Sequence, residues 1–312
     1  MKPIISDKIA LGAGGYQGEI GWHVWQNTQG HDDTTNSTRG DGPLVIVFHG
    51  FLAHGTYPTV RYAAELCAER LPGAIVVAAD MPGHGLSDGP RGYLAGGATG
   101  LMEKFGLPVL DAARNKYNGD GRRKIFLLGS SMGGTIAWQV ALREPAGAIA
   151  GVCLLAPMLK LKVSAIEEQA LGLLSLMIPT WNVIPSSSTS AEKQYRDTEK
   201  RAECENDSLT VKTTKICPAS ALTCVQLART ALNNEDGAAL QKFPVWIGIA
   251  DEDVVVDKTG SFDLQQKILA AGGAVTAPVY PALHGLLCEP SPLYDQITHD
   301  LLTWMKEQLE LQ

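Results

Sequence analysis

The feature that most constrains this chain is a glycine–serine motif between a short apolar run and a helix-forming run. Residues 124–128 form the apolar run, the motif Gly-Ser-Ser-Met-Gly occupies residues 129–133, and the helical pattern continues to about residue 143. Of the two serines, only Ser131 has glycine two positions before it and two positions after it. A strand, Gly-x-Ser-x-Gly and a helix in this order predict a sharp turn that exposes the Ser131 hydroxyl above a sheet. A glycine-rich turn without chemistry is the alternative interpretation.

Apolar runs of strand length alternate with helical patterns along most of the chain. This alternation predicts an α/β fold, with a parallel sheet covered by helices on both faces. The expected strands are residues 9–11, 16–25, 43–48, 74–79, 124–128, 148–156, 243–250 and 274–280, of which 16–25 is expected at a sheet edge. Ligands of such sheets bind at the carboxyl ends of the strands, where Ser131 lies.

The alternation stops between residues 158 and 240. Ser164 and Glu167 form a capping-box pattern that predicts a helix to about residue 178, and this helix is apolar on nearly every side. Residues 186–208 are polar and are expected to be solvated, and residues 219–232 predict another helix. The apolar helix is expected to line an acyl tunnel, to meet a membrane surface or to pack against the main domain.

Composition excludes several classes of protein. The 312 residues carry a formal net charge of −7, which argues against nucleic acid as a partner. No apolar stretch approaches the roughly 20 residues of a membrane span, and the N-terminus lacks the apolar region of a secretory signal. The six cysteines lack metal-ligand spacing, so no metal is expected. We therefore expect a cytoplasmic protein, peripheral to membranes where its apolar helix contacts them; the pattern leaves its oligomeric state undetermined.

A serine nucleophile needs a histidine base, and the histidine needs a carboxylate that orients it. In this architecture the order along the chain is serine, acid, histidine. Ser131, Asp251 and His284 fit this order, and each follows a predicted strand. Asp253 and Asp257 are rivals for the acid, but Asp251 lies nearest to the strand end. The backbone N–H groups of Phe51 and Met132 are the expected oxyanion donors.

The other histidines are expected to have structural or solvated roles. His23, His31 and His299 are expected to be solvated, His49 and His84 to bond loop backbone, and His54 has no assignment.

Several motifs together carry a resemblance to a known family. They are His49-Gly50 after a strand, Asp80-x-x-Gly-His-Gly-x-Ser-x-Gly with a later Arg91-Gly92, the motif around Ser131, Gly248-x-x-Asp251, and His284-Gly285. With these motifs the chain resembles the α/β-hydrolase superfamily, and more narrowly its monoacylglycerol lipase and lysophospholipase branch. The residues after Gly50 are bulkier than is usual in that branch, and residues 158–240 do not match it closely.

The resemblance implies a mostly parallel eight-stranded sheet with helices on both faces and an inserted helical lid. The core would comprise residues 1–157 and 241–312, and the lid residues 158–240. It also implies a serine esterase without cofactor that cleaves long-chain monoacylglycerols or lysolipids through an acyl-enzyme. The alternatives are a hydrolase of short-chain esters, aryl esters or amides, an acyltransferase of the same fold, and a catalytically silent scaffold.

Overall fold

The computed structural model describes the chain except for residues 13, 28–41, 95, 234–235 and 312. Its central sheet follows the order β1-β2-β4-β3-β5-β6-β9-β10, and β11 pairs with β9. The strands are β1 (Ile5–Ala10), β2 (Glu19–Gln26), β3 (Leu44–Phe48), β4 (Ile75–Ala79), β5 (Ile125–Ser130), β6 (Gly151–Leu155), β9 (Val245–Ala250), β10 (Val275–Thr276) and β11 (Val279–Tyr280). The pairs β1–β2 and β2–β4 are antiparallel, and the other pairs in the sheet are parallel. The predicted mostly parallel sheet is confirmed.

The two ends of the sheet differ from the prediction in detail. β2 is not an edge strand: the largely exposed β1 lies outside it, and residues 20–25 of β2 are buried. At the other end, the single predicted strand is split into β10 and β11, so the described sheet has nine strands instead of eight. Pro278 lies at the break. The strand is interrupted there because proline has no N–H to continue the ladder.

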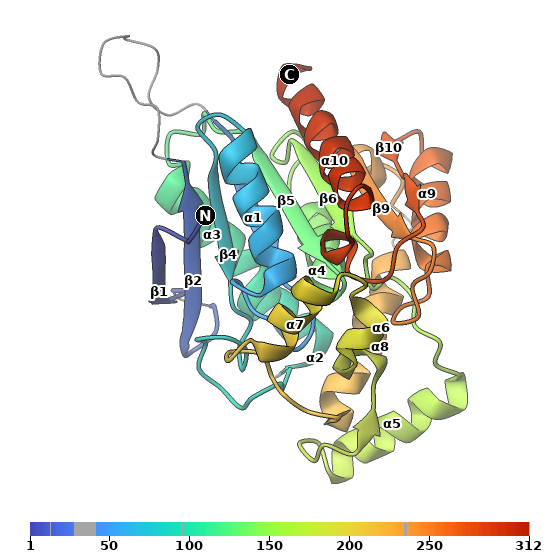
Figure 1. Cartoon of the computed structure of the whole chain (residues 1–312). Helices are drawn as coiled ribbons and strands as arrows, with labels where there is room; N and C mark the ends of the chain where they lie inside the picture. The colour runs from blue at the N-terminus through green and yellow to red at the C-terminus, as the bar shows by residue number, and fades with distance from the viewer. Residues whose placement is uncertain (13, 28–41, 95, 234–235, 312) are drawn as a thin grey trace.

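Helices cover both faces of the sheet (Figure 1). The helices α1 (Pro58–Arg70) and α10 (Leu293–Glu310) pack on one face. The opposite face is covered by α3 (Leu107–Tyr117), α4 (Met132–Arg143), α8 (Pro218–Leu232) and α9 (Thr259–Ala270). The predicted helix over residues 99–117 is a run of α2 (Gly97–Leu101), η1 (Met102–Gly106) and α3. Two apolar cores therefore sandwich the sheet and fix the ends of its strands.

The segment between β6 and β9 contains most of the remaining elements. These are α5 (Ala165–Met177), β7 (Ile184–Pro185), η2 (Ser187–Thr189), α6 (Ala191–Gln194), α7 (Thr198–Asn206), β8 (Lys215–Ile216), α8 and η3 (Ala239–Gln241). The predicted capping box is present, since Ser164 N–H donates to Glu167 Oε2 at 2.8 Å and Glu167 N–H donates to Ser164 Oγ at 3.3 Å. The polar stretch 186–208 is not simply solvated, because it forms helices and buries Tyr195 and Cys204. The division into core and lid remains a prediction.

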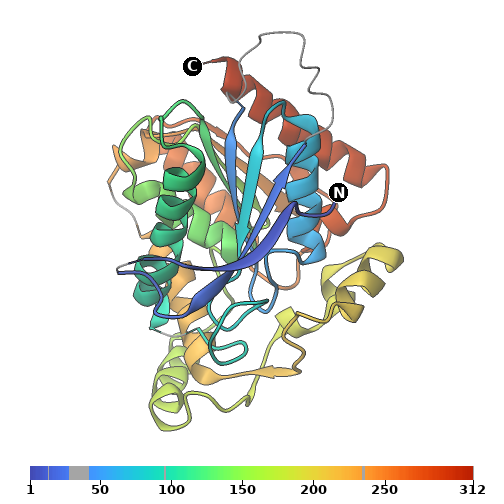
Figure 2. The same cartoon turned by 90° about the vertical axis from the view of Figure 1, so that its left-hand side faces the viewer.

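The helix α5 projects away from the sheet in both views (Figures 1 and 2). Leu171 is the residue of α5 that is buried, whereas several large apolar side chains on it and just after it are exposed. The exposed set is Ile166, Leu173, Leu176, Met177 and Trp181. Among the described residues, none of the helices has the length and apolar character needed to cross a bilayer.

Candidate active site

Ser131 occupies the predicted sharp turn between β5 and α4. Its φ of 56° and ψ of −123° are unusual for a residue with a side chain, and such strain concentrates at functional sites. The turn requires glycine on both sides, because a Cβ on Gly129 would lie 2.2 Å from Gly133 O, and one on Gly133 would lie 2.0 Å from Phe48 O. The Ser131 carbonyl accepts the N–H of Met158 at 2.9 Å, which holds the turn in place.

His284 follows β11 and is 5% exposed. Its Nδ1–H donates to Oδ2 of Asp253 at 2.6 Å. Oδ1 of Asp253 accepts the backbone N–H groups of Val255 at 2.7 Å and Val256 at 3.1 Å. Both oxygens of the Asp253 carboxylate are therefore hydrogen-bonded, and its side chain is only 1% exposed.

The prediction that Asp251 orients the imidazole is wrong. Asp251 is the residue whose N–H continues the ladder to Tyr280 O, and its side chain is 55% exposed and pairs with Lys258 Nζ at 2.6 Å. The turn that follows the strand carries Asp253 inward two residues later. Asp257, the other rival, instead accepts the N–H and hydroxyl of Thr259 at the start of α9. The backbone N–H groups of Asp251 and Glu252 pair with the end of β11 and the segment just after it, and the first residue beyond this pairing, Asp253, faces inward.

The loop after β3 lies directly beside Ser131. A Cβ on Gly50 would lie 3.4 Å from Ser131 Cβ and 3.9 Å from Ser131 Oγ. Among the described residues, the backbone N–H of Phe51 and that of Met132 donate to no backbone carbonyl. Met132 also begins α4, whose amino end carries partial positive charge. These two N–H groups are available to a negatively charged ligand.

His49 holds this loop through both ring nitrogens. Its Nδ1–H donates to Gly50 O at 2.7 Å, and its Nε2 accepts the N–H of Met81 at 2.8 Å. Burial lowers the pKa of His49 to about 3, and the neighbouring His84 adds to the shift. The neutral ring therefore connects the loop after β3 to the loop after β4, which confirms the prediction that His49 bonds loop backbone.

The remaining histidines divide between confirmed and corrected predictions. His84 donates from Nδ1 to Pro82 O at 3.0 Å, as expected of a structural residue, and His299 is exposed on α10. His54, which had no assignment, pairs with Asp207 at 2.8 Å. His31 lies outside the described residues. His23 is wrongly predicted, because it is fully buried and pairs with Asp80.

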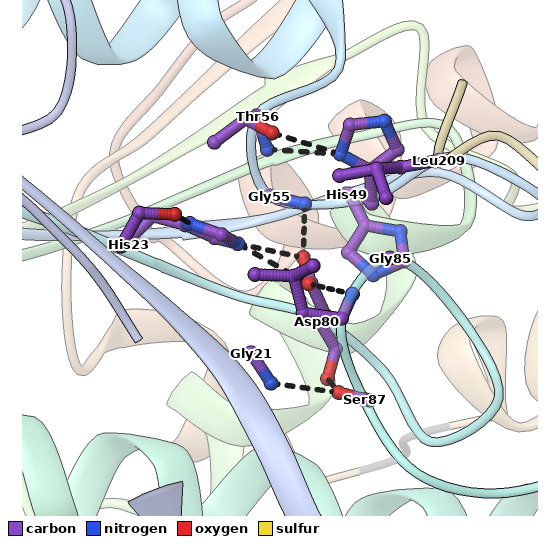
Figure 3. A network of polar contacts seen from close by, with 12 residues as sticks. Gly21, His23, His49, Gly55, Thr56, Asp80, Gly85, Ser87 and Leu209 are labelled. Atoms are coloured by element: carbon purple, nitrogen blue, oxygen red, sulfur yellow. Dashed lines mark hydrogen bonds and ion pairs between the residues drawn. The ribbon is translucent and has the colours of Figure 1, made fainter. Parts of the chain in front are cut away.

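Asp80 organises a buried polar network behind the loop after β3 (Figure 3). Its carboxylate accepts the N–H of Gly55 at 2.5 Å and that of Leu86 at 2.7 Å, and both oxygens lie 3.2 Å from Nε2 of His23. Burial opposes ionisation of Asp80, but the hydrogen bond and charge of His23 hold its pKa well below the usual range. Ser87 Oγ donates to the Asp80 carbonyl at 2.6 Å. The network fixes two loops that border the site.

Two cavities meet at Phe51. The first has a volume of about 310 Å³, reaches Ser131 and is mainly apolar. Its lining includes Met158, Leu161, Leu171, Ile184, Ile216 and Val225. The second has a volume of about 430 Å³ and a more polar lining that includes Thr189, Gln194, Tyr195, Glu205, Thr210 and Lys212. Phe51 lines both cavities, and the second cavity adds hydroxyl, amide and charged side chains to an otherwise apolar lining.

The structure thus brings the predicted residues together in two groups. Ser131 lies beside the loop of Gly50 and Phe51, and His284 is bonded to Asp253. Both groups lie at the carboxyl edge of the parallel strands, past β5 and past β11. Among the described residues, no direct hydrogen bond joins the Ser131 hydroxyl to His284. Such bonds often tighten only when substrate binds.

Comparison with known proteins identifies the family of this chain. The family model described as serine aminopeptidase, S33 (Hydrolase_4) matches residues 42–291. The chain is 25% identical to human monoglyceride lipase over 273 residues, which is 85% of this chain and 82% of that protein. It is 28% identical to phospholipase YtpA of Bacillus subtilis (strain 168) over 233 residues, 71% of this chain and 80% of that one.

A solved structure shares the fold over nearly the whole chain. A soluble variant of monoglyceride lipase from Saccharomyces cerevisiae superposes with a TM-score of 0.75 at 18% identity, and the match covers 99% of this chain and 96% of that one. Together with the matched family model, this similarity assigns the architecture. The chain belongs to the serine aminopeptidase S33 family, and it is a serine hydrolase of the lipase and esterase type with the α/β-hydrolase fold.

Proposed function

We propose that the chain cleaves the carboxylic ester of long-chain monoacylglycerols or lysolipids through an acyl-enzyme. The observation that carries this proposal is the pair of cavities at Phe51, of which one is apolar and reaches Ser131 and the other is lined in part by polar and charged side chains. A lipid monoester has the same two halves, an acyl chain and a hydrophilic alcohol. The names of two relatives, a monoglyceride lipase and a phospholipase, support the same substrate class.

In this mechanism Ser131 Oγ attacks the ester carbonyl carbon while Nε2 of His284 takes the hydroxyl proton. The Asp253 carboxylate accepts Nδ1–H, so it fixes the tautomer and stabilises the imidazolium that forms. The tetrahedral intermediate collapses when His284 returns the proton to the leaving alcohol. A water molecule then repeats both steps on the acyl-enzyme, which releases the fatty acid and restores Ser131.

The carbonyl oxygen gains negative charge in both tetrahedral intermediates. Within the described part of the chain, the N–H groups of Phe51 and Met132 donate to no backbone carbonyl and can serve this oxygen, and the adjacent start of α4 adds the positive end of its dipole. Each such donor contributes about 3 kcal/mol to transition-state stabilisation. His49 supports this loop without competing for the charge, because burial keeps its ring neutral.

We propose that the exposed apolar side chains of the α5 region contact a lipid surface. A helix that leaves Leu173, Leu176 and Met177 more than 60% exposed in water presents an apolar face, and Trp181 adds an aromatic anchor of the kind found at lipid interfaces. Leu171 on the same helix lines the apolar cavity. A long-chain substrate would thus pass from the surface contact into the cavity along one helix.

Kinetics with a ladder of acyl lengths test the proposed substrate class. Each buried CH₂ contributes about 0.8 kcal/mol, so kcat/KM on monoacylglycerols should rise about fourfold per added methylene until the cavity is filled. A Ser131→Ala variant should show no turnover on any member. Rates that peak at two to four carbons, or that favour aryl esters at equal length, would overturn the long-chain proposal in favour of a short-chain or aryl esterase.

A further inference from the structure

The loop that carries His284 is held by a fully buried carboxylate. Glu289 Oε1 accepts the N–H of Leu283, the residue before His284, at 2.6 Å. The other oxygen, Oε2, accepts no hydrogen bond from the described residues and lies 3.4 Å from Nη1 of Arg196. Burial raises the pKa of the Glu289 carboxyl above its usual range, which the Leu283 N–H and Arg196 oppose. The Leu283 N–H and Arg196 therefore both favour the charged form of Glu289.

Arg196 contacts both loops that matter for the proposed triad. Its Nη1–H donates to Pro281 O at 2.9 Å, three residues before His284. Its Nη2–H donates to Glu252 Oε2 at 2.9 Å, directly before Asp253. One guanidinium thus joins the loop of the imidazole to the loop of its carboxylate. A planar fork of donors is suited to such a junction, whereas a lysine ammonium is not.

The segment around Arg196 is itself clamped to the His284 loop. Gln194 O accepts the N–H of Gly285 at 2.8 Å, and a Cβ on Gly285 would lie 2.4 Å from the ring of Tyr195. Lys200 Nζ donates to the Glu289 carbonyl at 2.9 Å. Arg196 therefore approaches the triad loops from the segment between α6 and α7, far from both in sequence.

We propose that Arg196 and Glu289 are positioning residues that hold the Asp253 loop and the His284 loop in register. This inference rests on the proposed function, because it assigns the pair a role in the same reaction. Neither residue needs to touch the substrate. Their loss lets the imidazole and its carboxylate drift, and a drift of about 1 Å in a catalytic group costs on the order of 100-fold in rate.

The first test is a double-mutant cycle on a soluble short-chain ester, 4-nitrophenyl butyrate. Arg196→Gln and Glu289→Gln should each lower kcat about 10- to 100-fold and leave KM within about threefold, because the substrate cavities are untouched. The double variant should be faster than the product of the two single effects predicts, since both changes break the Arg196–Glu289 pair. Arg196→Lys should recover part of kcat. Effects that multiply, or an unchanged kcat in Arg196→Gln, would overturn the proposal.

Arg61→Gln is the matched control. Arg61 on α1 pairs with Glu203 on α7, so its loss loosens the same segment without touching the triad loops. Its kcat should stay within about twofold of the parent, and thermal unfolding of every variant shows whether each one folds. If Arg61→Gln loses as much kcat as Arg196→Gln, the effect is a general loosening and the proposal fails.

A second readout does not depend on esterase activity. The proton between Nδ1 of His284 and Asp253 should give a downfield NMR resonance that disappears in Asp253→Asn. It should broaden or shift in Arg196→Gln and stay in place in Arg61→Gln. A parent protein that hydrolyses no ester would refute the proposed function, whereas an unperturbed resonance in Arg196→Gln would refute the positioning role.

Discussion

Among the described residues, two histidine–aspartate pairs have both side chains no more than 5% exposed, and only one of them lies at a site suited to catalysis. In His284–Asp253 the nitrogen and oxygen are 2.6 Å apart, and in His23–Asp80 they are 3.2 Å apart. Each carboxylate also accepts two backbone N–H groups, those of Val255 and Val256 for Asp253 and those of Gly55 and Leu86 for Asp80. The second pair even has a serine, since Ser6 Oγ lies 2.7 Å from Nδ1 of His23.

The difference lies in what surrounds each serine. Ser6 belongs to the regular edge strand β1 and lies outside both cavities described above. Ser131 occupies a strained turn at the start of a helix, next to an apolar cavity and to the N–H groups of Phe51 and Met132, which bond no backbone carbonyl of the described residues. Serine, histidine and aspartate in contact therefore do not define a site by themselves. The turn, the oxyanion donors and the cavity distinguish the two arrangements.

The largest expected effect concerns the carboxylate of the first pair. Asp253→Asn should lower kcat about 10³- to 10⁴-fold, because the amide favours the wrong tautomer of His284. Asp251→Asn, two residues away and exposed, should change kcat less than about threefold. Steady-state kinetics on a soluble ester measure both. Equal losses in the two variants would contradict the assignment of Asp253.

We expect a change in the second pair to lower the stability of the fold rather than to act on catalysis directly. Asp80→Asn places an amide where the carboxylate accepts the N–H groups of Gly55 and Leu86 and pairs with His23. We expect the free energy of unfolding to fall by about 3 kcal/mol, as for other broken buried pairs. Urea unfolding followed by circular dichroism measures this change. A loss below about 1 kcal/mol would show that the network does not hold these loops.

Two neutral histidines beside Asp80 make the stability of the fold depend on pH. Burial lowers the pKa of His49 to about 3 and that of His84 to about 4, whereas an unfolded histidine has a pKa of about 6.5. Below pH 6.5 the unfolded chain binds protons that the folded chain does not. Stability should therefore fall as the pH drops from 6.5 towards 4, by up to about 1.4 kcal/mol per pH unit for each ring.

Urea unfolding at several pH values measures the slope. His49→Gln should reduce it, and His299→Gln, on an exposed surface of α10, should leave it unchanged. A slope that does not change in His49→Gln would mean that other groups carry the acid sensitivity.

The smallest expected effect is at the serine of the second pair. Ser6→Ala removes one partly exposed hydrogen bond, which is worth about 1 kcal/mol or less. Neither kcat nor KM should change. A substantial loss of kcat would mean that the Ser6–His23–Asp80 arrangement contributes to turnover, which would remove the distinction between the two pairs.

The sequence predicts what depends on local pattern. The turn at Ser131 follows from two glycines between a strand and a helix, and His284 follows from its place after the last strand. The choice between Asp251 and Asp253 depends on which residue of one turn faces inward, and that direction is set by pairing with β11. Ladder pairing of this kind joins residues far apart in the chain, so local patterns do not reveal it.

Burial of polar residues is likewise set by tertiary contacts. The pattern of β2 reads as an edge strand, but β1 pairs outside it and encloses His23. The polar composition of residues 186–208 reads as solvated, but its Tyr195 and Arg196 pack against the loop of His284. In both places the partner segment lies more than ten residues away, and its position decides the environment.

Labelling with a fluorophosphonate probe, followed by peptide mass spectrometry, tests the central claim most directly. The account predicts one adduct, on Ser131, with labelling that slows strongly in Asp253→Asn and is unchanged in Ser6→Ala. An adduct on Ser6 or Ser130, or no adduct on the folded protein, would contradict it.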